Sequence, residues 1–341
     1  MFVLNNWYVA GFADELAPGT SLARMLCAIP VVLFRASEGQ VAALEDRCPH
    51  RGMPLGGGVC TGSSLRCPYH GLEFDVTGAC TRIPGQERIP PDMRLRTYPL
   101  VEQDQMLWIW LGDPAKADAS TITRYPYDQD PRWVASHTKT EYACNWELLN
   151  DNLLDPSHLR FVHAANVAEQ DDIDVAERYE RVGRTVHVHR RVDGIEAAPF
   201  FASAYPFTGR IDRIWDIEFR PGLFIYTVSA IPAGSGATQE NPEIGVHLRH
   251  FHGVTPVDEN RTLYFFALAR NFRLEDQAMT RQMIDQVEGV LEEDRLILER
   301  QHSRLLETPS RPLVARRADE GLLHGRRIVR EMLSEEAWPP P

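Results

Sequence analysis

Four residues in the first fifth of the chain could hold a redox-active metal cluster: Cys48, His50, Cys67 and His70. They lie in two short boxes, Cys-Pro-His-Arg-Gly and Cys-Pro-Tyr-His-Gly, with sixteen residues between His50 and Cys67. Each box offers one thiolate and one imidazole. Some [2Fe–2S] clusters have one iron held by two cysteines and the other by two histidines, which raises the reduction potential. The two boxes therefore indicate one-electron chemistry.

A structural zinc site is the alternative for these boxes, because zinc also accepts two cysteines and two histidines. Such sites usually place two cysteines on one loop and two histidines on another, whereas each loop here is mixed. In both boxes a proline directly follows the cysteine and a glycine ends the box. Proline stiffens a loop and glycine lets it turn tightly. These features favour the iron–sulfur cluster.

The two boxes resemble those of the Rieske non-haem iron oxygenases. Rieske proteins of respiratory and photosynthetic electron transfer add a disulfide between the loops, and this chain has Met53 and Tyr69 at the positions of those cysteines. The resemblance therefore favours the oxygenases or the small Rieske ferredoxins. A ferredoxin is a single small domain, whereas 341 residues suggest two domains at roughly 100–200 residues each.

A second candidate metal site lies in the segment from Asn152 to His163, which also contains Asp155 and His158. Two histidines five residues apart do not share a face of a straight helix. Pro156 can end the preceding helix and let the chain bend at Asp155. Alternatively, Asp155 caps a new helix that begins at Pro156. The two interpretations are compatible.

The third ligand is expected from an acidic run that contains Glu292, Glu293 and Asp294. Asp294 has apolar neighbours one turn before and one turn after it, which places it on the buried stripe of a helix. Glu292 has charged neighbours at this spacing and should face water, and Glu293 is intermediate. A buried carboxylate is costly unless it is paired or bound to metal. Asp294 would complete a facial triad with His158 and His163, leaving Fe(II) positions open.

The pattern Asn-x-x-Asp-x-x-His-x₄-His resembles the mononuclear iron box of the Rieske oxygenases, and this sequence fills every position. Length and layout are similar to the shorter oxygenase subunits of the O-demethylase and methyl-monooxygenase type. The resemblance implies a homotrimer in which the cluster of one chain delivers electrons to the mononuclear iron of the next. It makes Asp155 and Asn152 catalytic residues, with Asp155 bridging a histidine at the iron and the neighbour's His70.

The implied reaction is that of the terminal oxygenase component of a multicomponent monooxygenase. It would use O₂ and two electrons to O-demethylate or hydroxylate a small aromatic compound, with an aromatic acid favoured. The alternatives are cis-dihydroxylation of an aromatic ring and, in another class, electron transfer without oxygen chemistry. His252 matches a polar substrate-contacting histidine of the family, and Phe266 is a candidate for an apolar pocket wall. His247 and His250 compete with His252 for this role.

Electrons are expected from a separate protein, because the sequence contains neither a Gly-x-Gly-x-x-Gly fingerprint nor a plant-type ferredoxin cysteine spacing. This partner would be an NAD(P)H-dependent reductase carrying flavin and a plant-type [2Fe–2S] centre, or a ferredoxin. No bound flavin or NAD is expected. The net charge of −12 argues against nucleic acid and anionic membrane as partners. With no apolar run near the ~18 residues of a membrane span and no signal-peptide pattern, we expect a cytoplasmic protein.

The elements around these residues indicate an α+β fold in two domains. Residues 1–114 contain regularly spaced short β segments, including 31–34, 41–44, 72–76 and 107–111, and suggest a small all-β domain, which the resemblance identifies as the Rieske domain. The second domain is expected at 115–341, where a helix at 145–154 precedes strands at 185–189, 211–219, 223–229, 246–254 and 262–269. A long helix is expected at 275–306. Strands flanked by helices suggest an antiparallel sheet covered by helices around the mononuclear iron.

Overall fold

The computed structural model describes residues 1–163, 177–237 and 241–336, which divide into two compact units. The first unit contains Met1–Arg124, Thr255–Glu259 and the residues from Met332 on. The second contains Tyr125–Val254 and Asn260–Glu331. The domain boundary expected after residue 114 stays a prediction. Among the residues described, no helix is both long and apolar enough to cross a membrane.

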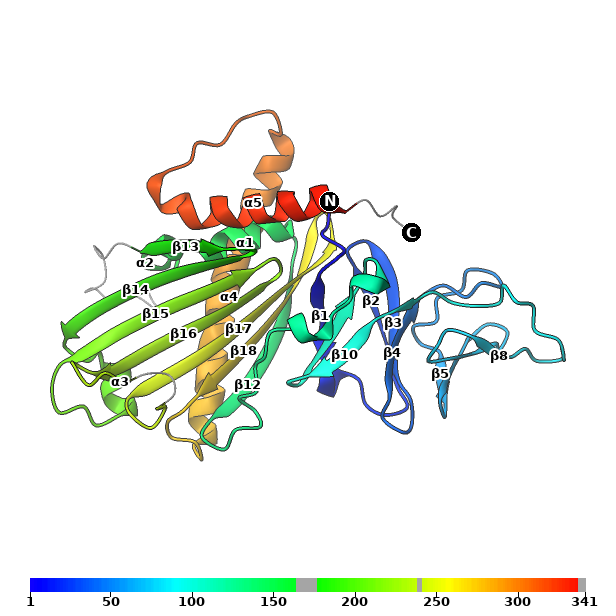
Figure 1. Ribbon diagram of the computed structural model, residues 1–341, viewed down its shortest axis with the longest axis horizontal. Coiled ribbons are helices and arrows are strands. Elements are labelled where there is room, and N and C mark those ends of the chain that lie inside the picture. The colour runs from blue at the N-terminus through cyan, green and yellow to red at the C-terminus, as the bar shows by residue number, and fades with distance from the viewer. Residues whose placement is uncertain (164–176, 238–240, 337–341) are drawn as a thin grey trace. The chain divides into compact units, whose positions relative to one another are not determined.

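The first unit is all-β, as the sequence predicts, with three small antiparallel sheets (Figure 1). One sheet has the order β1-β11-β10, with β1 at Trp7–Phe12, β10 at Leu100–Gln103 and β11 at Met106–Trp110. The second has the order β2-β3-β4-β9, at Ser21–Leu26, Ile29–Arg35, Val41–Glu45 and Thr97–Tyr98. The third has the order β5-β6-β7-β8, at Val59–Thr61, Ser64–Arg66, Glu73–Asp75 and Cys80–Arg82.

The second unit is built on a seven-stranded sheet of order β12-β18-β17-β16-β15-β14-β13. The strands span Val134–Tyr142 (β12), Arg178–Val182 (β13), Thr185–Ile195 (β14), Ile211–Arg220 (β15), Leu223–Pro232 (β16), Val246–Asp258 (β17) and Arg261–Arg270 (β18). Five of these strands were predicted from the sequence, while the two edge strands β12 and β13 were not. Both edge strands alternate between more and less exposed residues and lack a long apolar run. Hydrophobic residues in the sequence therefore do not mark them as strands.

The helices that lie wholly or mostly in the second unit are α1 (Trp146–Leu154), α2 (Leu159–Val162), α3 (Pro199–Ala204), α4 (Gln277–Glu307) and α5 (Glu320–Glu335). The predicted helices at 145–154 and 275–306 correspond to α1 and α4. Figure 1 shows α4 running across one face of the sheet, and its contacts include β12 and α1. Its buried side chains are Met283, Leu291, Asp294, Leu298 and His302, which recur at helical spacing.

Two tyrosines of the sheet hold the helices that carry the second candidate site. The Tyr142 hydroxyl donates to the Leu291 carbonyl of α4 at 2.6 Å, and the Tyr226 hydroxyl donates to the Leu153 carbonyl of α1 at 2.5 Å. Both hydroxyls are buried. A buried phenol needs a hydrogen-bond partner, and the last carbonyls of a helix lack an intrahelical one. The sheet therefore fixes the end of α1 against the middle of α4.

Candidate metal centres

The two cysteine–histidine boxes form loops of identical backbone design. In the first, the Cys48 amide donates to the Met53 carbonyl and the Gly52 amide donates to the Cys48 carbonyl, both at 2.8 Å. In the second, the Cys67 amide donates to the Leu72 carbonyl at 2.7 Å and the Gly71 amide to the Cys67 carbonyl at 3.1 Å. The two loops therefore match residue for residue, although the histidine is one place later in the second box.

Glycine closes both loops because the backbone there is left-handed. Gly52 has φ +68° and Gly71 has φ +72°, a region that L side chains rarely adopt. A Cβ on Gly71 would also lie 3.2 Å from Cγ of Pro84. The glycines that end the two boxes in the sequence are thus required by the turn itself.

The four predicted ligands separate into two buried thiols and two exposed imidazoles. Cys48 and Cys67 are 1% and 2% exposed, whereas His50 and His70 lie on the surface with ring centroids 4.5 Å apart. Burial, together with the neighbouring Cys67, raises the pKa of the Cys48 thiol to about 11. Two adjacent buried thiols suit a cationic iron, which would replace their protons. The donor set fits a [2Fe–2S] cluster with one sulfur-bound and one nitrogen-bound iron.

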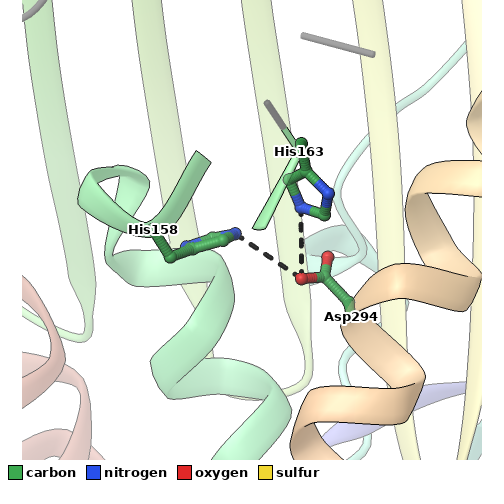
Figure 2. A group of neighbouring side chains, drawn as sticks. All are labelled: His158, His163 and Asp294. Atoms are coloured by element: carbon green, nitrogen blue, oxygen red, sulfur yellow. Dashed lines mark ion pairs between the residues drawn. The ribbon is translucent and has the colours of Figure 1, made fainter. Parts of the chain in front are cut away.

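The second candidate centre is a cluster of His158, His163 and Asp294 (Figure 2), whose ligand atoms all lie within 4.8 Å of one another. His163 Nε2 is 3.2 Å and His158 Nε2 is 3.6 Å from Oδ1 of Asp294. His163 is fully buried and Asp294 is 6% exposed. Two imidazoles and one carboxylate that converge in this way have the composition of a facial triad for non-haem Fe(II).

The bend after α1 brings the two histidines together despite their spacing. The helix ends at Leu154, and Pro156–His158 form a single 3-10 turn that precedes α2. The Asp155 carboxylate caps this turn by accepting a hydrogen bond from the Ser157 amide at 2.9 Å. Both sequence interpretations are confirmed, because the chain bends at Asp155 and Pro156 begins the following turn.

Each histidine is anchored through Nδ1, which leaves Nε2 for a metal. His158 Nδ1 lies 2.5 Å from the Asp155 carbonyl, to which it can only donate, and His163 Nδ1 lies 2.7 Å from Oε2 of Glu293. Burial opposes a charge on His163, but the contacts with Asp294 and Glu293 outweigh it and raise the pKa of His163. Anchors of this kind fix the ring orientation and increase the basicity of a metal ligand.

Glu293 is the site residue that the sequence argument undervalued. Helical periodicity gave it only an intermediate position between the buried Asp294 and the exposed Glu292. The structure leaves its side chain 31% exposed, with one oxygen on His163. Glu292 is 51% exposed and paired with Arg295, as expected. The sequence does place Glu293 directly beside the predicted ligand Asp294. The contact between Glu293 and His163 is formed only when the chain folds, so the sequence alone does not predict it.

Asn152 lies beside the triad and makes two contacts through one atom. Its Nδ2 donates to Oδ1 of Asp294 at 3.1 Å and lies 3.5 Å from Nε2 of His158. Its buried Oδ1 has no hydrogen-bond partner among the residues that the structure describes. A buried carbonyl oxygen without a donor is costly. Asn152 therefore orients the carboxylate and offers an acceptor for a water or ligand at the site.

A cavity of about 590 Å³ opens onto the triad. The strand register places its lining residues, since Arg190, Trp215, Val228 and Leu248 are directly paired across β14, β15, β16 and β17. The next row towards the triad contains Tyr226 and His250, which pair directly. His252 and Phe266 line the cavity, as does His250, whereas His247 lines a different hollow. The predicted pocket residues are thus brought together with the metal ligands.

His252 is a neutral, buried donor–acceptor in this cavity. Its Nδ1 lies 2.6 Å from the Tyr264 hydroxyl, and within the described part of the chain its buried Nε2 has no hydrogen-bond partner. Burial, followed by the nearby His250, holds the pKa of His252 well below its ordinary value. The imidazole is therefore uncharged at neutral pH and can form a hydrogen bond with a polar atom of a substrate.

Comparisons with known proteins agree with this construction. The Rieske [2Fe-2S] domain family matches residues 6–99, and the vanillate O-demethylase oxygenase C-terminal domain family matches residues 142–335. The chain is 37% identical to the toluene-4-sulfonate monooxygenase system iron-sulfur subunit TsaM1 of Comamonas testosteroni, covering 98% of each. It is 33% identical to a vanillate O-demethylase oxygenase subunit of a Pseudomonas species, covering 98% of this chain and 96% of that one.

A solved structure of dicamba monooxygenase with non-heme iron and dicamba has a TM-score of 0.83 and 29% identity, covering 98% of each chain. A Rieske [2Fe–2S] domain joined to a sheet-and-helix domain with two histidines and a carboxylate at a cavity defines the class of Rieske non-haem iron oxygenases. The chain belongs to this family, with a second domain of the vanillate O-demethylase oxygenase type. It is an O₂-dependent oxidoreductase, the oxygenase component of a system that needs a separate reductase or ferredoxin. The predicted fold class, enzyme class and cofactors are confirmed.

Proposed function

We propose that this oxygenase acts on a small aromatic acid, which it O-demethylates or hydroxylates at a methyl group. The carrying observation is the cavity of about 590 Å³ that joins the triad to an aromatic-lined wall. Its volume lies within the usual range for small-molecule sites. The relatives' names include vanillate, toluene-4-sulfonate and dicamba, all aromatic acids or their salts. Arg190 and Arg213 line the cavity and supply positive charge for such a substrate.

The ligand assignment is part of this proposal. Cys48 and Cys67 hold one iron of the [2Fe–2S] cluster, and His50 and His70 hold the other. His158, His163 and Asp294 hold the mononuclear iron. When bound, the two groups supply one-electron transfer and O₂ activation. The protein's own side chains orient the ligands through Glu293 and Asn152, exclude water from the apolar cavity, and offer His252 to a polar group of the substrate, with Phe266 against its ring.

Electron delivery is assigned to a homotrimer, in which the cluster of one chain serves the mononuclear site of the next. Asp155 bridges the two, with its carbonyl on His158 and its carboxylate available to His70 of the adjacent chain. The electron source is an NAD(P)H-dependent reductase with flavin and a plant-type [2Fe–2S] centre, or a ferredoxin. We place the system in the cytoplasm.

The test is product analysis of the iron-loaded enzyme with a flavin and [2Fe–2S] reductase, NADH and O₂. The panel contains 4-methoxybenzoate, vanillate, 4-toluenesulfonate and the unsubstituted benzoate. Formaldehyde released in proportion to NADH consumed establishes O-demethylation, and a hydroxymethyl product establishes methyl hydroxylation. A cis-diol would move the activity to ring dihydroxylation. NADH use with only peroxide formed would contradict the proposed substrate class.

A further inference from the structure

Two arginines, one in the segment before α5 and one in α5 itself, form ion pairs with carboxylates at the end of α1. Arg326 of α5 donates to the Asp151 carboxylate of α1, with Nε 3.0 Å from Oδ1. Arg316, which precedes α5, donates to Oδ2 of Asp155 at 2.8 Å. The two carboxylates are four residues apart, and the two arginines are ten residues apart. Both ion pairs lie within the second unit.

Two glycines let α5 lie close to this end of α1. A Cβ on Gly321 would lie 3.2 Å from the Leu154 carbonyl oxygen of α1 and 2.7 Å from Cε1 of Tyr179 on β13, and one on Gly325 would lie 2.7 Å from Cδ1 of Leu154. Figure 1 shows α5 beside α1. Gly costs helix stability relative to Ala, so two glycines one turn apart are explained by this close approach. The contact fixes the segment that carries Arg316 relative to Asp155.

Arg316 belongs to a small network around the Asp155 carboxylate. Its Nη2 donates to Oδ2 of Asp155 at 2.8 Å and to Oγ of Ser157 at 2.5 Å, while its Nε lies 3.4 Å from Oδ1 of Asp319. The other Asp155 oxygen, Oδ1, accepts from the Ser157 amide. The orientation of the carboxylate is therefore set from both oxygens. Each oxygen can still accept a further hydrogen bond, because a carboxylate offers about four acceptor positions.

We propose that Arg316 is a positioning residue for electron transfer, which holds the Asp155 carboxylate aimed at the electron donor of the neighbouring chain. The inference rests on the proposed bridging role of Asp155. Arg316 is 59% exposed, and exposed ion pairs add little to stability. Its effect is therefore expected in the rate of electron transfer and not in folding. Within the described part of the chain, the hydrogen bonds and ion pairs of Arg316 go to Asp155, Ser157 and Asp319 and to neither histidine of the triad.

The test compares Arg316→Gln with Arg316→Lys and with the matched control Arg317→Gln. Arg317 is the next residue and is exposed, so its replacement removes the same charge without altering the described contacts of Asp155. Each holoenzyme is reduced and mixed with O₂ and the panel acid that the wild-type enzyme turns over fastest. The absorbance of the cluster then reports its reoxidation in a single turnover. Iron content, KM, the cluster reduction potential and the oligomeric mass are measured in parallel.

We expect Arg316→Gln to slow cluster reoxidation by about tenfold to a hundredfold, the usual effect of removing a partner of a metal-site group. Iron content, KM and oligomeric mass should match the wild type, and the reduction potential should move further than in Arg317→Gln. Arg316→Lys should recover part of the rate, because a lysine can still pair with Asp155. Reoxidation at the wild-type rate in Arg316→Gln, an equal effect of Arg317→Gln, or loss of the oligomer would overturn the inference.

A parallel Asp155→Asn holoenzyme separates this inference from the proposal on which it rests. If Asp155→Asn slows reoxidation and Arg316→Gln does not, the bridge stands and the role of Arg316 is wrong. If Asp155→Asn reacts at the wild-type rate, the bridge itself is wrong, and the role of Arg316 falls with it.

Discussion

The two candidate metal centres of this chain are built in opposite ways. The four Rieske ligands lie on two loops within one stretch of 23 residues, from Cys48 to His70. Each loop is closed by hydrogen bonds within its own backbone. The triad joins His158 and His163 to Asp294, which is more than 130 residues further along the chain. Its ligands are oriented by side chains and a carbonyl from α1, α4 and the turn between α1 and α2.

This difference explains what each centre depends on. The Rieske loops close on their own backbone hydrogen bonds, with a glycine at each turn, so local sequence specifies most of their shape. The triad needs α1 and α4 to be held against the same sheet, which Tyr142 and Tyr226 do through helix carbonyls. A change far from the triad in sequence can therefore disturb it, whereas the Rieske loops respond to changes within the boxes.

The largest effect is expected from Asp294→Ala, which should empty one centre and leave the other intact. Without the carboxylate, two imidazoles alone should not retain Fe(II), and product formation should fall to background. The visible spectrum of the cluster should persist, while iron falls from about three to about two atoms per chain. Glu292→Gln, at an exposed acid two residues away, is the control and should keep full iron. Normal iron content in Asp294→Ala would remove this residue from the triad.

A smaller effect within the Rieske loops is expected from Gly71→Ala compared with Gly52→Ala. Both replacements force alanine into the left-handed region, at a cost of roughly 1–2 kcal/mol. Gly71→Ala should cost more, because its Cβ would lie 3.2 Å from Pro84, while the nearest atom to a Gly52 Cβ is Nε of Arg47 at 3.6 Å. Urea-induced loss of the cluster absorbance measures both. Gly209→Ala, with open space around the new Cβ, should leave cluster loss unchanged; equal midpoints for all three would refute the argument.

The pH dependence of stability should reveal the buried carboxylate that ties α1 to α5. Burial raises the pKa of Asp151 to about 6, although Arg326 acts in the opposite direction. The folded state thus binds this proton more tightly than the unfolded state. The contribution of Asp151 to the free energy of unfolding is therefore largest near pH 4 and is lost as the pH rises through about 6, by at most ~3 kcal/mol.

The measurement is urea unfolding from pH 4.5 to 7 for the wild type and Asp151→Asn. The free energy of unfolding of the wild type minus that of Asp151→Asn should decrease as the pH rises. Asp130→Asn is the control. Arg132 lowers the pKa of Asp130 by hydrogen bonding, so the contribution of Asp130 is fully present above its ordinary pKa, and the wild-type-minus-Asp130→Asn difference should stay flat from pH 4.5 to 7. A wild-type-minus-Asp151→Asn difference that grows with pH would contradict the assignment.

The smallest effect concerns two helical glycines that the sequence does not distinguish. Gly289→Ala on α4 places its Cβ in open space and should stabilise the protein by about 0.5–1 kcal/mol through helix propensity. Gly325→Ala on α5 gains the same propensity but places its Cβ 2.7 Å from Leu154 and 3.0 Å from Phe219. It should therefore be neutral or destabilising. Thermal unfolding compares the two, and equal stabilisation by both would mean that α5 does not need close approach to α1.

The sequence predicted the cluster boxes, the bend at Asp155 and the buried position of Asp294, because each depends on local residue types or on helical period. It did not predict the role of Glu293, since the partner of that carboxylate comes from another part of the chain. The same holds for Arg316, which reaches Asp155 across 161 residues. Strand register, which no local pattern contains, placed His250 with His252 in the cavity and His247 outside it.

The most direct test of the account is the metal content of the purified chain, measured as iron and acid-labile sulfide together with the electron paramagnetic resonance of the reduced protein. The account predicts about three iron atoms and about two sulfides per chain, with the signal of a histidine-ligated [2Fe–2S] cluster. One iron would then belong to the triad. Two irons with two sulfides, in protein supplied with Fe(II), would mean that the second centre does not hold iron and would contradict the assignment of this chain's oxygen chemistry to His158, His163 and Asp294.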